Sequence, residues 1–191
     1  MLDYVSRWLT ANHMTAARVA FILPIALVME WAPESPGWLF AAWVLFFVAC
    51  LTDWWDGMLA RHQQSTTKLG KLLDPVADKL LIGSLLILLV EMGRAPAWLV
   101  VLLIARELTV TGLRAVAAAD NVVIAANAGG KWKTISQMFA TGFLIIHYET
   151  LWLPCHEIGI GLLWLATLQS LWTGWLYIRG YFEALPNSFS T

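Results

Sequence analysis

Long apolar runs are the feature that most constrains how this chain can fold. Each is close to the roughly 20 residues that an α-helix needs to cross a bilayer, and we place six of them at residues 14–30, 36–60, 71–92, 96–116, 133–149 and 157–181. Short breaks such as "APESPG" and "GRAP" and two longer connections, "RHQQSTTKLG" and "AAADNVVIAANAGGKWK", separate the runs. The pattern predicts an all-α polytopic membrane protein with six transmembrane helices in a single domain over residues 1–191.

The composition agrees with a membrane protein and excludes several other classes. Of the 191 residues, 59% are hydrophobic and only 13% are charged, whereas about a quarter of the residues of a soluble domain are charged. Twelve Trp residues, many near the ends of the apolar runs, suit the bilayer interface. No basic run indicates a nucleic-acid partner. The two cysteines, Cys50 and Cys155, have no metal-ligand or disulfide-framework spacing.

The basic residues predict the orientation in the membrane. With the N-terminus on the cytoplasmic side, every Lys and Arg except Arg94 falls on or toward that side. Positive charge accumulates on the cytoplasmic side of membrane proteins. We therefore expect both termini in the cytoplasm. The first apolar run lacks the flanks of a cleaved signal peptide, and we expect it to remain as a span.

Four aspartates stand where the second apolar run ends and the third begins. Asp53 and Asp56 share one helical face, and Asp74 and Asp78 share another. If the two helices are antiparallel neighbours, these faces meet on the cytoplasmic side. One such aspartate is usually a helix cap, but four converging carboxylates repel one another unless a cation lies between them.

The chemistry of these residues indicates the kind of ion and ligand. Carboxylate oxygens favour hard divalent cations such as Mg²⁺ or Mn²⁺, and two such ions can bind a diphosphate and stabilise developing charge. Gly57, Ala60 and Gly70 are small, so a bulky ligand can approach the helix backbone. Arg61 can donate to a phosphate.

The pattern D-x-x-D-G-x-x-A-R-x8-G-x3-D-x3-D, from Asp53 to Asp78, resembles at every fixed position the signature of the CDP-alcohol phosphotransferases. These membrane enzymes cleave the diphosphate of a CDP-linked lipid or alcohol and transfer the phosphoryl-bearing group to an acceptor hydroxyl. The chain also has the size and six-span plan of that family. The resemblance implies the CDP-alcohol phosphotransferase fold and a divalent metal, Mg²⁺ or Mn²⁺, in two copies.

Further stretches narrow the resemblance to one branch of the family. "GKLLDPVADKLL", "IARELTVTGLR", "GKWKT" and "NHMTAAR" are similar to the bacterial phosphatidylglycerophosphate synthases. This resemblance implies CDP-diacylglycerol as donor, sn-glycerol 3-phosphate as acceptor, and phosphatidylglycerophosphate and CMP as products, in the synthesis of phosphatidylglycerol and cardiolipin. It also implies a place in the bacterial inner membrane, with the active site on the cytoplasmic side and membrane lipid as a partner.

The family pattern assigns roles that spacing alone does not. It implies metal ligation by Asp53, Asp56, Asp74 and Asp78, with Asp78 also the general base. It further implies that seven residues contact CDP: Gly57, Ala60, Arg61, Gly70, Thr67, Asn12 and Thr15. A base is needed because a glycerol hydroxyl is a poor nucleophile, and neutralising the charge of the CMP leaving group is work suited to metal ions.

The phosphate of the acceptor needs basic residues close to the metals. Arg106 and Arg114 lie in the fourth apolar run, where a charge well inside a span must face protein or water. Their spacing allows both to line one cavity. Lys131 and Lys133, at the start of the fifth run, either anchor the chain at the cytoplasmic interface or complete the phosphate pocket; the branch resemblance favours the pocket. We expect Glu107 to pair with a buried base.

Two other hypotheses remain open from the sequence. Another enzyme of the same family could use inositol phosphate, serine or phosphatidylglycerol as acceptor, because the aspartate signature does not distinguish acceptors. A small cation transporter could use the aspartates as ion ligands, although their position at one face rather than along a midplane pathway argues against it. The family resemblance also implies a homodimer.

Overall fold

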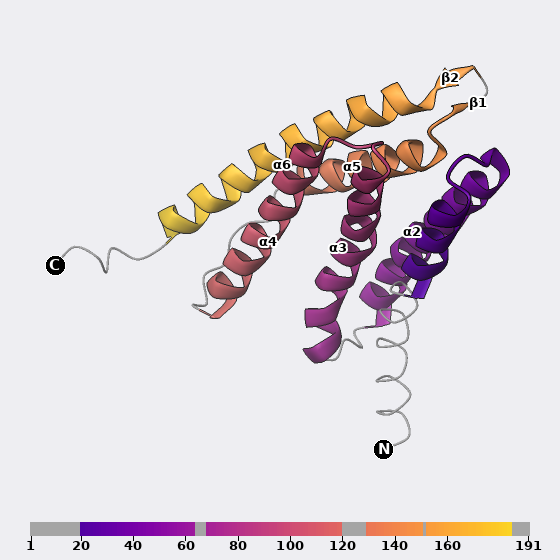
Figure 1. Cartoon of the computed structure of the whole chain (residues 1–191). Helices are drawn as coiled ribbons and strands as arrows, with labels where there is room; N and C mark the ends of the chain where they lie inside the picture. The colour runs from indigo at the N-terminus through magenta and orange to yellow at the C-terminus, as the bar shows by residue number, and fades with distance from the viewer. Residues whose placement is uncertain (1–19, 64–67, 120–128, 151, 185–191) are drawn as a thin grey trace.

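The computed structural model describes residues 20–63, 68–119, 129–150 and 152–184, with side chains except at 53–63, 68–78, 119 and 129–131. Residues 20–31 are helical, and five further helices follow: α2 (Pro36–Gln63), α3 (Lys68–Glu91), α4 (Ala97–Ala119), α5 (Gly129–Ile146) and α6 (Cys155–Ala184) (Figure 1). The described part of the chain is therefore almost entirely helical, as the predicted all-α class requires. The beginning of the first predicted run, residues 14–19, lies outside the described residues.

The helices are longer than the apolar runs. The expected ten-residue connection "RHQQSTTKLG" is wrong in length, because α2 continues to Gln63 and α3 already begins at Lys68. Likewise α4 ends at Ala119 and α5 begins at Gly129, so the second connection is also shorter than predicted. The residues gained are mostly polar or small, with Leu69 and Trp132 as exceptions, and include strong helix formers such as Lys, Arg, Gln and Ala. Apolar runs mark where a helix is buried, not where its backbone hydrogen bonding stops.

A small β-hairpin between α5 and α6 is absent from the prediction. Strands β1 (Glu149–Thr150) and β2 (Leu153–Pro154) pair antiparallel. His147 and Trp152, with φ of 63° and 65°, reverse the chain on either side of β1. The pairing satisfies backbone groups in a tight turn, and the "LPCHE" break accordingly becomes a strand and the first turn of α6 rather than a plain loop.

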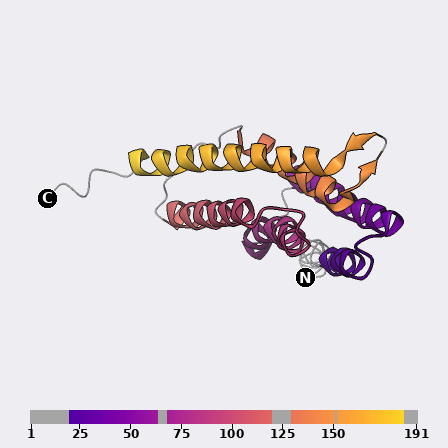
Figure 2. The same ribbon diagram turned by 45° about the horizontal axis from the view of Figure 1, so that its top comes forward.

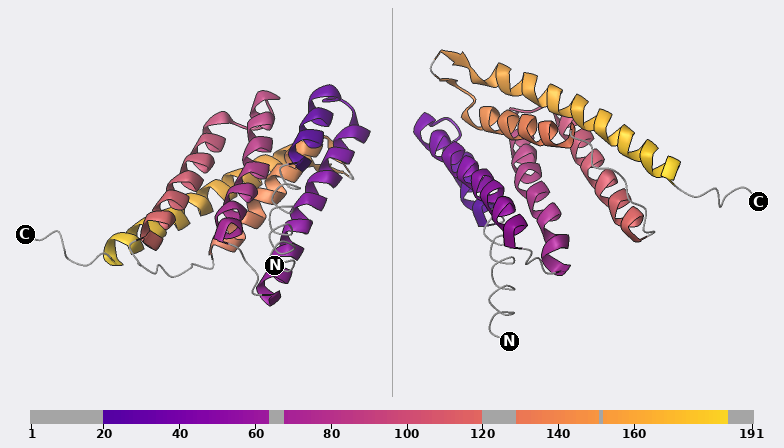
Figure 3. Two further views of the ribbon diagram at one scale, coloured as in Figure 1. Left: turned by 90° about the horizontal axis from the view of Figure 1, so that it is seen from below. Right: turned by 180° about the vertical axis from the view of Figure 1, so that it is seen from behind.

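The helices form three antiparallel hairpins (Figure 1; Figure 2; Figure 3). Residues 20–31 pair with α2, α3 with α4, and α5 with α6, and the last hairpin crosses the other two. Through this crossing α5 contacts α2 and α3, while α6 contacts α4. One helix, α5, therefore touches both of the helices on which the aspartates lie.

Close packing of the α5–α6 hairpin depends on a glycine. A Cβ on Gly159 of α6 would lie 2.8 Å from Leu144 Cγ and 3.1 Å from the Leu144 backbone nitrogen of α5. A larger residue at position 159 would therefore push α5 and α6 apart. Large apolar residues fill the remaining core, including Phe46, Leu85 and Leu103.

Apolar side chains also cover much of the outer surface. Val101, Leu168, Trp172 and Trp175 are among the exposed large hydrophobic residues of α4 and α6. Within the described residues, no helix combines the length and the apolar character required to cross a membrane.

Arg94 joins three connections at one end of the molecule. Its side chain is buried in the α3–α4 turn and donates to the Ile145 carbonyl (3.2 Å) and the Pro33 carbonyl (2.6 Å). The Tyr148 hydroxyl donates to the same Pro33 oxygen at 3.3 Å. Burial lowers the pKa of the guanidinium, yet an arginine remains charged in proteins. Arg94 thus links the ends of all three hairpins.

Candidate functional site

A cluster of three charged side chains connects α4 to α5. Glu107 Oε1 accepts from Arg106 Nη1 at 3.0 Å and also from Lys133 Nζ. All three side chains are 8–15% exposed, so water screens the cluster only weakly. The expected pairing of Glu107 with a buried base is confirmed, and the carboxylate pairs with two bases. Because Lys133 is held by a carboxylate, the ammonium group has a fixed position beside α4.

The rest of the Arg106 side chain is bound to α6. Arg106 Nε donates to the Ser170 carbonyl at 2.7 Å, and Nη2 donates to Thr173 Oγ1 at 2.8 Å. The helix can approach this closely because residue 174 is glycine: a Cβ there would lie 2.9 Å from Arg106 Nε. The guanidinium is therefore directed into the α4–α6 interface. Its hydrogen bond to Glu107 holds that carboxylate in place.

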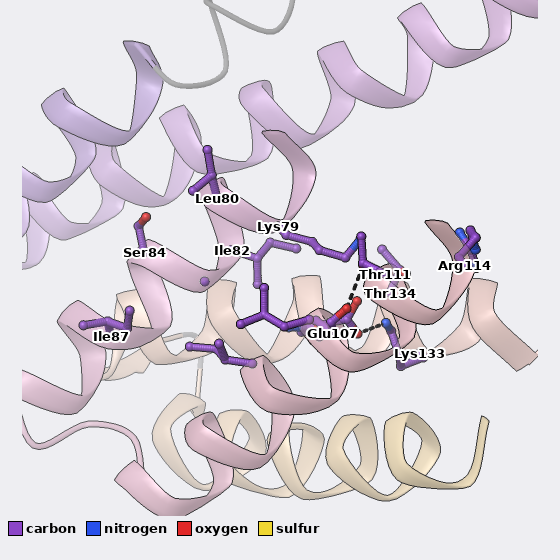
Figure 4. A pocket seen from close by; sticks show the side chains of 14 residues that line it. Lys79, Leu80, Ile82, Ser84, Ile87, Glu107, Thr111, Arg114, Lys133 and Thr134 are labelled. Atoms are coloured by element: carbon purple, nitrogen blue, oxygen red, sulfur yellow. Dashed lines mark hydrogen bonds and ion pairs between the residues drawn. The ribbon is translucent and has the colours of Figure 1, made fainter. Parts of the chain in front are cut away.

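A cavity of about 550 Å³ lies between α3, α4 and α5 (Figure 4). Its charged lining residues are Lys79 of α3, Glu107 and Arg114 of α4, and Lys133 of α5. Among the lining residues whose side chains the structure describes, three cations stand against one carboxylate. A cavity with this lining favours an anion.

The cavity has a polar and an apolar part. Ser84, Thr111, Thr134 and Gln137 contribute hydroxyl or amide groups. Gly83 and five aliphatic residues also line the cavity: Leu80, Ile82, Ile87, Ile104 and Leu108. In Figure 4 the labelled side chains of Lys79, Glu107 and Lys133 converge at one end, and Ile87 lies at the other. A ligand with an anionic group and an apolar portion matches this division.

Arg114 presents its charge differently from Arg106. Its side chain is exposed, and its guanidinium carbon lies 5.5 Å from the centre of the Tyr177 ring of α6. A cation over an aromatic face is attracted by the ring while its N–H donors lie in the plane of the guanidinium. Tyr177 therefore positions Arg114 at the cavity without using the donors that an anion would accept.

The four aspartates lie on the two helices expected for them. Asp53 and Asp56 belong to α2, and Asp74 and Asp78 belong to α3. Asp53 is ten residues before the end of α2 and Asp78 is ten residues after the start of α3, which is about 15 Å of helix in each case. These positions would have the same depth if α2 and α3 ran antiparallel side by side, but these two helices do not form one of the three hairpins of the structure, and the meeting of their acidic faces stays a prediction. The four carboxylate side chains themselves lie outside the described part of the structure.

The same boundary applies to the predicted CDP contacts. Gly57, Ala60 and Arg61 belong to α2 and Gly70 to α3, where the backbone alone is described. Asn12, Thr15 and Thr67 lie outside the described residues. Among the side chains that the structure does describe, no three His, Cys, Asp or Glu gather as a metal site. The proposed metal ligands are not among those side chains.

The predicted acceptor residues separate into three groups. Arg114 and Lys133 both line the cavity, whereas Arg106 is bound by α6 and Glu107. Lys131 belongs to α5, but its side chain lies outside the described set. Phosphate binding by any of them stays a prediction.

The sequence reading misses Lys79, Thr134, Gln137 and Tyr177 as neighbours of the site. A signal was available for Lys79, because it directly follows Asp78 on the same helix. No sequence signal pairs Arg114 with Tyr177, since their contact depends on how α6 crosses α4.

Comparison with known proteins gives a family match over most of the chain. Residues 8–172 match the family model described as CDP-alcohol phosphatidyltransferase. This range contains the aspartates of α2 and α3, the residues that line the cavity and the greater part of α6.

Individual relatives are similar over nearly the full chain. A CDP-diacylglycerol--glycerol-3-phosphate 3-phosphatidyltransferase of Bacillus subtilis (strain 168) is 40% identical, covering 93% of this chain and 97% of its own length. A protein of that name from Rickettsia bellii (strain RML369-C) is 34% identical over 88% of this chain and 92% of its own. A probable phosphatidylglycerophosphate synthase of Mycobacterium tuberculosis (strain ATCC 25618 / H37Rv) is 42% identical over 72% of this chain and 64% of its own.

Proposed function

This chain belongs to the CDP-alcohol phosphatidyltransferase family, and we propose that it transfers the phosphatidyl group of CDP-diacylglycerol to sn-glycerol 3-phosphate. The products are phosphatidylglycerophosphate and CMP. The names of the relatives from Bacillus subtilis and Rickettsia bellii support this donor and acceptor. The observation that supports glycerol 3-phosphate as the acceptor is the cavity lined by cationic side chains. One of these is Lys79, the residue after Asp78.

Glycerol 3-phosphate fits the polar end of the cavity. Its phosphate is a dianion, and charge-assisted hydrogen bonds from Lys133 and Arg114 would hold it. Glu107 and Arg106 keep the Lys133 ammonium in place, so little conformational freedom is lost on binding. Thr111 and Thr134 also line the cavity and can hydrogen-bond to the glycerol hydroxyls. Serine, a zwitterion with no phosphate, would use this cationic lining less well.

The four aspartates suit a divalent cation by the chemistry of their donors. Carboxylates are the ligands that Mg²⁺ and Mn²⁺ prefer, and a two-helix arrangement at matching depth would bring them together. When bound, one or two such ions neutralise negative charge on the diphosphate and on the departing CMP. Asp53, Asp56 and Asp74 would hold the metal.

The chain's own residues then supply the proton chemistry. Asp78 accepts the proton of the acceptor hydroxyl as this hydroxyl attacks the β-phosphorus of CDP-diacylglycerol. The position of Lys79 in the cavity wall, directly after Asp78 in the chain, supports binding of the acceptor close to that aspartate. Gly57, Ala60 and Gly70 allow the CDP moiety to lie against the helix backbones, and Arg61 donates to its phosphates.

We place the helices across the bacterial inner membrane, with six spans and the aspartates on the cytoplasmic side. The exposed apolar side chains of α4 and α6 support lipid contact, and the distribution of Lys and Arg supports the orientation. The acyl chains of the donor can then remain in lipid while the headgroup reacts at the interface. We also propose a homodimer, which chemical cross-linking in membranes would detect as a doubled mass.

Site-directed labelling tests the placement. In a cysteine-free background, Trp152→Cys in the α5–α6 turn should react with an impermeant maleimide added to intact cells, whereas Glu183→Cys near the end of α6 should react only after lysis. Both positions are exposed, so accessibility to the reagent does not depend on unfolding. Labelling of both from the same side would contradict the proposed topology.

The reaction is tested with purified protein, CDP-diacylglycerol and a panel of acceptors: glycerol 3-phosphate, inositol phosphate, serine and phosphatidylglycerol. We expect CMP release with glycerol 3-phosphate and Mg²⁺ or Mn²⁺, and none after chelation. Release with a different acceptor would replace the proposed substrate. No release with any acceptor, combined with ion flux in liposomes, would replace the enzyme by a transporter.

Lys133→Met refines the acceptor site. The variant leaves Glu107 paired with Arg106, so no carboxylate is left without a partner. Loss of one charge-assisted bond of about 1.5–3 kcal/mol should raise the KM for glycerol 3-phosphate about 10- to 100-fold and leave the KM for CDP-diacylglycerol unchanged. A rise in the KM for CDP-diacylglycerol alone would assign the cavity to the donor.

A further inference from the structure

The α5–α6 turn brings together two histidines that the proposed reaction does not use. His147 Nδ1 and His156 Nδ1 are 3.4 Å apart, and the ring centroids are 5.2 Å apart with the planes at 90°. Both side chains are partly accessible. The pair is about 20 Å from Lys133, measured by helical rise along α5. It is therefore separate from the cavity.

The spacing of the two nitrogens matches a shared metal ion better than a direct hydrogen bond. The donor and acceptor of an N–H···O hydrogen bond lie about 2.7–3.2 Å apart, and the 3.4 Å between these two nitrogens is longer. Two imidazole nitrogens at about 2.05 Å from a tetrahedral zinc ion lie about 3.4 Å apart, with ring centres about 5.2 Å apart. The distances in this protein agree with the second arrangement in both respects.

The backbone at His147 is a second indication. Its φ of 63° is left-handed, and its N–H donates to the Phe143 carbonyl at 3.0 Å, which closes the C-terminus of α5. Glycine or asparagine usually occupies this position, because a larger side chain is disfavoured there. A histidine accepts the unfavourable conformation, and the ring it carries is directed at His156.

Charged groups of both signs surround His147. Glu34 and Glu157 act on His147 as negative charges, and Arg94 acts as a positive one. The Arg94 guanidinium donates to the Pro33 and Ile145 carbonyls.

We propose that His147 and His156 form a binding site for a divalent transition-metal ion, Zn²⁺ or Cu²⁺, that links the end of α5 to the start of α6. Imidazole nitrogen suits these ions and not Mg²⁺. Among the side chains that the structure describes, no third His, Cys, Asp or Glu completes a metal cluster. Water supplies the remaining ligands, which makes the ion exchangeable.

Cu²⁺ is the probe, because electron spin echo spectroscopy detects and counts its imidazole ligands. The full-length protein is purified without a polyhistidine tag, and Mg²⁺ in excess occupies the carboxylate site. One equivalent of Cu²⁺ should then show two coordinated imidazoles, and added Zn²⁺ should displace it. A copper signal without imidazole nitrogen would overturn the proposal.

Single variants identify the ligands. His147→Asn retains a residue that tolerates the left-handed conformation, and His156→Asn makes the same change on α6. Each should bind the metal about tenfold or more weakly and show at most one imidazole, whereas His62→Asn, a control for histidine content, should match the parent protein. Circular dichroism without metal verifies that the variants are folded. Unchanged copper spectra in both variants would contradict the assignment, and the spectrum of the parent protein decides the case even if a variant does not fold.

Discussion

Arg94 and Arg114 show two ways in which this protein uses an arginine. Arg94 is 5% exposed and donates to two backbone carbonyls, Pro33 and Ile145, from different hairpins. Arg114 is exposed at the cavity, where an aromatic ring positions its guanidinium. A charge whose donors are satisfied within the fold stabilises the fold. A charge that faces a cavity with its donors directed outward can bind a ligand.

The largest expected effect lies outside this comparison and tests its premise, that the cavity belongs to a reaction centre. Asp78→Asn removes the proposed base and should lower the rate of CMP release about 10³-fold, because general-base catalysis contributes roughly 10²- to 10⁴-fold. Glu183→Gln, the same chemical change in an exposed ion pair with Arg179, should leave the rate unchanged. Full activity in Asp78→Asn would remove the proposed role of the aspartate.

Arg94→Met tests the structural arginine. The buried Ile145 carbonyl and the partly buried Pro33 carbonyl would each lose a charged donor, so we expect a loss of about 3 kcal/mol in unfolding free energy, measured by denaturant titration in detergent. The KM for both substrates at a permissive temperature should stay the same. A raised KM for glycerol 3-phosphate with unchanged stability would reverse the assignment of the two arginines.

Arg114→Met is the matched change at the cavity, and the opposite outcome is expected. The KM for glycerol 3-phosphate should rise about 10- to 50-fold, as expected for one lost charge-assisted hydrogen bond, with little change in stability. Arg179→Met, an exposed arginine on α6, is the control. Equal effects of Arg114→Met and Arg179→Met on the KM would show that general surface charge, and not the cavity, attracts the acceptor.

The smallest effect concerns the hairpin that carries Lys133. Gly159→Ala would place a Cβ 2.8 Å from Leu144 Cγ, and overpacking of this kind costs about 1–2 kcal/mol. Gly161→Ala, two residues further along α6, meets nothing within 4 Å and should be neutral or slightly stabilising, because alanine favours helix. The melting temperatures of the Gly159→Ala and Gly161→Ala variants, each compared with that of the parent protein, measure the two effects. Similar shifts would mean that α5 and α6 are not closely packed at Gly159.

The sequence predicted the helices better than their ends. Apolar runs locate α2 to α6, since burial of apolar surface drives their packing. The runs do not locate the termini, because Arg61 to Gln63 and Lys68 continue their helices without apolar side chains. The hairpin of Glu149–Thr150 with Leu153–Pro154 was missed, because two-residue strands carry no periodic signal.

The sequence by itself determined the family and predicted the donor chemistry, because the aspartate pattern behind both is a local spacing along two helices. Their helical positions follow from a 3.6-residue period, which does not require knowledge of any other segment. The tertiary structure decided which bases share the cavity. Arg106 and Arg114 are equivalent candidates in the sequence, but the crossing of α6 over α4 binds Arg106 through Ser170 and Thr173 and leaves Arg114 at the cavity. Contacts between residues more than sixty positions apart are set by how the hairpins pack, and no local pattern encodes them.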